Sequence, residues 1–105
     1  MAVVEISSGV CGFTTRIEGS ADASLQVALE ITSECSRIQD LAQHLTQVSA
    51  MEELFQPITE TQTYRAAAKC GLHTACPVPS AILKAIEVAS GMALPADVHM
   101  TIHTN

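Results

Sequence analysis

The spacing of the hydrophobic residues changes near residue 35 of this 105-residue chain. Before that point they alternate with more polar residues, as Val4 and Ile6 do, and as Val27, Leu29 and Ile31 do again. Such alternation is typical of strands that bury one face. Beyond it, hydrophobic residues recur at intervals of three and four, which is typical of amphipathic helices. This change of period predicts an α+β fold in which the strands come first.

Three strands are predicted in the first third of the chain, at residues 2–8, 13–18 and 25–31. They are separated by a turn at 9–12, which contains two glycines, and by a loop of small and polar residues at 19–24. Glycine adopts the positive φ angles that tight turns need, and consecutive strands usually pair. We therefore predict an N-terminal three-stranded antiparallel meander.

Three to four helices are predicted in the following part of the chain. An apolar stripe runs through residues 38–48, and a short helix is predicted within 49–57 because its start has capping-box spacing and a proline ends it. An alanine-rich helix is predicted at 64–69, and another carries the hydrophobic residues of 82–89. Each of the last two is followed by a glycine, which commonly closes a helix.

The last residues return to strand-like alternation. Val98, Met100 and Ile102 alternate with polar residues that include His99 and His103. We predict a C-terminal strand that joins the edge of the same sheet. The two histidines share a face of this strand, but four residues of extended chain separate their imidazoles too widely to bind one ion unaided, so solvated side chains are expected.

Composition argues against several kinds of partner. The net charge is −6, the five lysine and arginine residues are scattered, and only three residues are aromatic. Nucleic acids and anionic membranes are therefore not expected as partners, because both attract clustered basic residues. No stretch approaches the roughly 20 apolar residues of a membrane span, and the N-terminus lacks the features of a secretory signal. We expect a single domain, 1–105, in the cytoplasm, where thiols stay reduced.

Two of the four cysteines are predicted to lie at the same end of the sheet. Cys11 precedes the second strand and Cys35 follows the third, and these strands run antiparallel. If the hairpin is symmetric about its loop, Phe13 lies opposite Ile31 or Thr32. Both cysteines then lie just beyond one end of the meander.

The other two cysteines enclose a short loop that can present both sulfurs on one side. Cys70 and Cys76 are separated by five residues, among them Gly71 and His73, and Pro77 follows the second cysteine. Glycine permits a sharp turn after the preceding helix, and proline stiffens the exit. The sequence leaves open whether this loop folds over the end that carries the first two cysteines.

Four thiolates suit tetrahedral zinc or an iron–sulfur cluster. The proposed metal ligands are Cys11, Cys35, Cys70 and Cys76, with His73 as a substitute ligand or a donor to sulfur. Such a site can be structural, or it can serve electron transfer or metal delivery. The spacing matches no known metal signature, since no CxxC pair occurs.

Two other interpretations of the cysteines stay open. Cys35 near a helix start can act as a reactive thiolate in redox or sulfur-carrier chemistry, with Cys11 as its resolving partner. Alternatively, the cysteines are core filler, and the chain is a non-catalytic interaction module that forms a homo-oligomer through a bare sheet edge. No catalytic triad, P-loop or dinucleotide-binding fingerprint occurs, so no enzyme is indicated.

Four segments together resemble a family of small uncharacterised four-cysteine proteins from anaerobic bacteria and archaea. They are the Gly9–Phe13 turn, the isolated Cys35, the Cys70–Pro79 loop and the Ala81–Glu87 helix. The resemblance spans nearly the whole chain and carries no assigned activity. It implies an oxygen-poor cytoplasm, which suits an iron–sulfur site.

Overall fold

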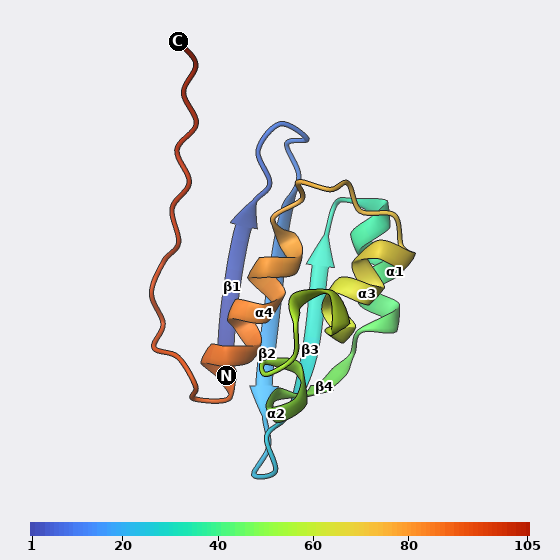
Figure 1. Cartoon of the computed structure of the whole chain (residues 1–105), viewed down its shortest axis with the longest axis vertical. Helices are drawn as coiled ribbons and strands as arrows, with labels where there is room; N and C mark the ends of the chain where they lie inside the picture. Colours follow the sequence, from blue (N-terminus) through green and yellow to red (C-terminus); the bar gives the residue numbers. More distant parts are fainter.

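Four strands form one antiparallel sheet in the order β1–β2–β3–β4 in the computed structural model, which describes residues 1–105 (Figure 1). The strands are β1 (Ala2–Ser7), β2 (Thr14–Ala21), β3 (Gln26–Ser33) and β4 (Gln47–Ser49). The helices are α1 (Ser36–His44), α2 (Ala50–Glu53), α3 (Gln62–Lys69) and α4 (Val78–Ala89), with a 3-10 turn at Ile58–Glu60. The predicted α+β class and the N-terminal meander are confirmed.

The helices cover one face of the sheet. α4 packs over β1 and β2, and α1 packs against β3 (Figure 1). The core between the two layers is aliphatic, and its largest fully buried side chains include Ile17, Leu41, Ile82 and Ile86. This helix-covered face explains the alternation in the strands, because only every second residue meets the helices. None of the helices is long and apolar enough to cross a bilayer.

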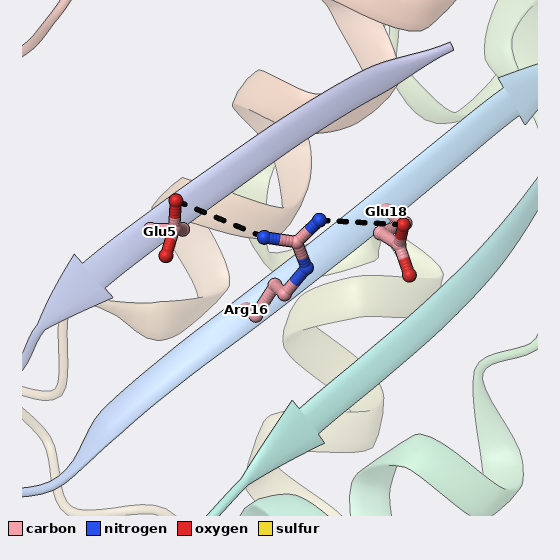
Figure 2. Close-up of polar contacts among 3 residues, drawn as sticks. All are labelled: Glu5, Arg16 and Glu18. Carbon is pink, nitrogen blue, oxygen red and sulfur yellow. Dashed lines mark ion pairs between the residues drawn. The ribbon is translucent and has the colours of Figure 1, made fainter.

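The opposite face of the sheet is open and polar. On it, Arg16 of β2 lies between two carboxylates, 3.8 Å from Glu5 and 3.6 Å from Glu18 (Figure 2). The Arg16 and Glu5 side chains are about half and three-quarters exposed. Ion pairs this exposed contribute only about 0–1 kcal/mol to stability. They therefore contribute little to holding the sheet together.

The predicted C-terminal strand is wrong. The fourth strand is β4, within the stretch expected to end the first long helix, and Val48 is buried there. After α4, the Glu87 carbonyl accepts the backbone N–H groups of Met92 and Ala93, and no later residue makes a backbone hydrogen bond. Alternation predicts which face of a strand can be buried, but a strand also needs a partner edge within hydrogen-bonding reach.

The hairpin between β2 and β3 is shifted from its predicted register. β2 continues to Ala21, so the turn lies at residues 22–25, and Leu25 has a φ of 64°. The Asp22 carboxylate accepts the hydroxyl and N–H of Ser24 and the N–H of Gln26, and these bonds, the hydroxyl first, lower its pKa. This capped turn favours the later position.

The shifted register places Cys35 closer to the Cys11 turn than the sequence predicted. Thr15 pairs with Ser33, so continuing the ladder places Phe13 level with Cys35, not with Ile31 or Thr32. The Glu34 side chain extends this contact, because its carboxylate accepts the Thr14 N–H at 3.0 Å. Only residues 34–35 separate the end of β3 from the start of α1.

Candidate functional site

Three connecting segments meet at one end of the sheet. They are the loop after β1 (residues 8–13), the turn between β3 and α1 (residues 34–35), and the loop from α3 to α4 (residues 70–77). Figure 1 shows them together at the upper end, where the α3–α4 loop crosses above β3 and β2 to the start of α4. All four cysteines lie on these segments.

Cys11 is exposed at the tip of a glycine turn. Gly9 and Gly12 have φ angles of 85° and 75°, and the Gly12 N–H donates to the Gly9 carbonyl at 2.9 Å. No heavy atom outside the turn lies within 4 Å of where a Cβ would stand on either glycine. The Cys11 thiol is therefore carried on a loop with open space around it.

Cys35 is half-buried at the N-cap of α1. Its own N–H donates to Ser33 Oγ at 3.1 Å, and its carbonyl accepts the Gln39 N–H at 2.9 Å. No side chain caps the first turn of α1. The first backbone N–H groups of α1 therefore have no side-chain acceptor and lie beside Cys35.

Cys76 lies directly before the first turn of α4 and is half-buried. Burial is the largest cause that raises the pKa of its thiol. A hydrogen bond from the Val78 N–H lowers this pKa, while negative charge on Cys35 and on Cys11 raises it further. Charge on Cys35 or on Cys11 therefore affects the ionisation of Cys76.

Cys70 faces elsewhere. It caps the C-terminus of α3 and lines a hollow between α1 and α3, together with His44 and Lys69. The loop that follows is held to α1 by Arg37, whose Nη1 donates to the Gly71 carbonyl at 2.6 Å. His73 is exposed, and its carbonyl accepts the Cys76 N–H.

The segments that carry Cys11, Cys35 and Cys76 thus meet at this end of the sheet (Figure 1), whereas Cys70 lines the hollow between α1 and α3. No three of the histidine, cysteine, aspartate and glutamate side chains lie close enough together to hold a metal ion. This end of the molecule therefore carries thiols on neighbouring loops, but their side chains do not surround a common metal position.

Ser8 is a polar residue that sequence reasoning missed. Its hydroxyl oxygen is buried and has no hydrogen-bond partner, although most buried hydroxyls have one. It directly precedes the Cys11 turn. The only signal in the sequence is its position between the end of a strand and a glycine turn, where a serine commonly bonds to nearby backbone.

The exposure of these thiols predicts an order of chemical reactivity. At pH 8, iodoacetamide is expected to alkylate Cys11 first and Cys76 more slowly, because the thiolate reacts and the pKa of Cys76 is raised. The pH at which the Cys76 rate reaches half its maximum should lie above the ordinary thiol value of about 8.5. Peptide mass spectrometry over time measures both rates, and equal rates in the folded protein would contradict the arrangement.

The fold and this end of the sheet define a small α+β protein with neighbouring thiols on its connecting loops. The chain belongs to a family of unknown function, DUF6951, whose model matches residues 2–102. This agrees with the resemblance to an uncharacterised family, and the matched range includes the extended segment after α4. Comparison with curated proteins and with solved structures found no similar protein.

Proposed function

We propose that this protein binds a soft metal ion or an iron–sulfur cluster through Cys11, Cys35 and Cys76. The observation that carries the proposal is that the segments holding these cysteines meet at one end of the sheet (Figure 1), where charge on Cys35 and on Cys11 adds to the rise that burial causes in the pKa of Cys76. Thiolates that repel one another attract a cation placed among them. Binding of zinc or iron would therefore deprotonate all three and remove the repulsion.

Hydrogen-bond donors around the sulfurs support a metal-bound thiolate site. The Val78 N–H partly offsets the rise that burial causes in the pKa of Cys76, and the unpartnered Ser8 hydroxyl lies in the segment that leads to Cys11. The uncapped first turn of α1 adds free N–H groups beside Cys35. Donors of this kind orient metal ligands and stabilise their charge.

Closure of the site requires movement of the Cys11 turn and a fourth ligand. The open space around Gly9 and Gly12 allows the turn to move. His73 is favoured as the fourth ligand because it is exposed and lies in the same loop as Cys76, three residues earlier. Cys70 is the less favoured ligand, because it would have to leave the hollow beside α1.

The position of the site favours electron transfer or metal delivery over a purely structural role. Structural zinc sites are closed and fully coordinated. Here Cys11 is exposed at a loop tip, and none of the three cysteines belongs to the buried core. The resemblance to proteins of anaerobic bacteria and archaea implies an oxygen-poor cytoplasm, which favours an iron–sulfur cluster over zinc.

The test is metal content after anaerobic reconstitution. We expect about one zinc per chain, or visible absorption from a cluster after treatment with iron and sulfide. Cys35→Ser and Cys76→Ser should each lose nearly all of the metal, with unchanged far-ultraviolet circular dichroism. Cys70→Ser is the matched control and should retain it. A metal-free wild type, or equal loss in Cys70→Ser while folded, would overturn the three-thiol site.

A second candidate function, a thiol–disulfide couple between Cys35 and Cys11, is favoured by one observation. The sheet register places Phe13 level with Cys35, so the Cys11 turn lies beside the start of α1. In this reaction an external disulfide accepts two electrons and two protons, and Cys35 and Cys11 form an S–S bond. Peptide mapping after treatment with oxidised glutathione should then recover a Cys11–Cys35 peptide. Mixed disulfides with glutathione alone would contradict it.

A further inference from the structure

β1 is an edge strand whose outer side has no partner. The Ser8 N–H donates to the Phe13 carbonyl, so the alternation of an antiparallel ladder turns the N–H and C=O groups of Val3, Glu5 and Ser7 away from β2. Natural edge strands are commonly blocked by proline, lysine or a bulge. β1 contains no proline or lysine and pairs regularly with β2 along its length.

The apolar layer is also incomplete beside β1. Val4 and Ile6 point to the helix-covered face but are only half-buried, whereas Ile17 on the neighbouring strand is fully buried. The difference arises because the sheet ends at β1 and nothing packs against the outer sides of these two residues. One more strand with apolar residues on this face would cover them.

The segment 97–103 has the properties of that missing strand. Val98, Met100 and Ile102 are 70%, 78% and 82% exposed, and they alternate with polar residues. The segment is extended and makes no backbone hydrogen bond. Its seven residues suffice to cover β1, which has six.

We propose that the segment 97–103 of one copy adds to the outer edge of β1 in a second copy, and that reciprocal exchange forms a homodimer. Within one chain the segment leaves the body near the start of β1 and runs outside the sheet (Figure 1). Each copy thus offers one unpaired segment and the unpaired edge of β1, so two copies can pair these reciprocally.

The side-chain pattern specifies how the added strand faces. With Val98, Met100 and Ile102 on the helix-covered side, they extend the layer formed by Val4 and Ile6. The alternating polar residues then lie on the open face of the sheet, which already carries charged side chains. A shift by one residue would reverse both faces, so the apolar pattern defines which side of the added strand meets the helices.

The test is the concentration-dependent mass of the full chain by light scattering and analytical ultracentrifugation. We expect a dimer of twice 11.1 kDa that dissociates on dilution. Met100→Asp should weaken dimerisation at least about tenfold, a difference of about 1.4 kcal/mol. Thr101→Asp adds the same charge to the opposite face of the segment and should change it less than about twofold.

The β1 edge is tested by a second pair of variants. Glu5→Pro removes an outward N–H that makes no bond within the chain, and proline is tolerated at such edge positions. It should weaken the dimer as Met100→Asp does, whereas Glu5→Thr loses the same ion pair but keeps the N–H and should not. Circular dichroism confirms that each variant is folded.

Mixing the two disruptive variants separates exchange from other contacts. A heterodimer of Met100→Asp with Glu5→Pro retains one fully intact strand-to-edge contact, whereas each variant homodimer has none. The mixture should therefore dimerise more tightly than either variant alone. The proposal is overturned if the protein is monomeric at all concentrations. This holds also if hydrogen exchange shows that the segment is protected by β1 of the same chain. It is equally overturned by a dimer that none of these variants weakens.

Discussion

Replacing Glu53 with alanine is expected to lower the free energy of unfolding by about 4 kcal/mol. Glu53 is 1% exposed, and its carboxylate accepts the N–H groups of Gln62 and Thr63 at 2.8 Å each and the Thr63 hydroxyl at 2.6 Å. These donors belong to the first turn of α3, which favours negative charge. Alanine would leave buried donors without an acceptor, and it would also leave a cavity.

Urea denaturation followed by circular dichroism measures this loss. Glu52→Ala is the matched control, because the neighbouring glutamate is exposed and should change stability by less than about 0.5 kcal/mol. Glu53→Gln should fall between the two, since the amide keeps one acceptor oxygen but places an NH₂ group against backbone donors. A loss below about 1 kcal/mol in Glu53→Ala would show that water replaces the carboxylate.

Replacing Gly19 with valine is expected to destabilise the fold by about 3 kcal/mol. A Cβ at this position of β2 would lie 3.3 Å from the Ala89 Cβ and 3.4 Å from the Ala85 carbonyl oxygen. The two further methyl groups of valine would press on the backbone of α4, which cannot move without opening the core. Valine suits strands better than glycine by up to about 1 kcal/mol, so the clash outweighs that gain.

The next residue supplies the control for this substitution. Ser20 is exposed on the open face, so Ser20→Val should change stability by less than about 0.5 kcal/mol. Gly19→Ala should cost less than Gly19→Val, because a single methyl group needs a shift of only a few tenths of an ångström. Equal stability of Gly19→Val and Ser20→Val would contradict the close packing of α4 on β2.

The N-terminal meander was predictable because its determinants are local. Alternation of Val27, Leu29 and Ile31 specifies a strand with one buried face wherever the rest of the chain lies. The capping residue Ser49 was also readable, and its hydroxyl accepts the Glu52 N–H as capping-box spacing predicts. Such signals act over a few residues and do not depend on tertiary contacts.

The register of the hairpin was less predictable. Gly19 was expected in a loop, yet it lies within β2, where the absence of a side chain lets α4 approach. A glycine in a strand can mark either a turn or a close contact, and only the packed helix distinguishes the two. The same limit applies to residues 98–102. Their hydrophobic residues do alternate with polar ones, but no strand edge within the chain pairs with this segment.

The sequence by itself determined the α+β class, the three-stranded meander, and the position of Cys11 and Cys35 at one end of it, because strand direction and alternation follow from local spacing. Only the tertiary structure decided that Cys76 joins them while Cys70 lines the hollow beside α1. The physical reason is that the α3–α4 loop is placed by long-range contacts, such as Arg37 with Gly71, which no local pattern encodes.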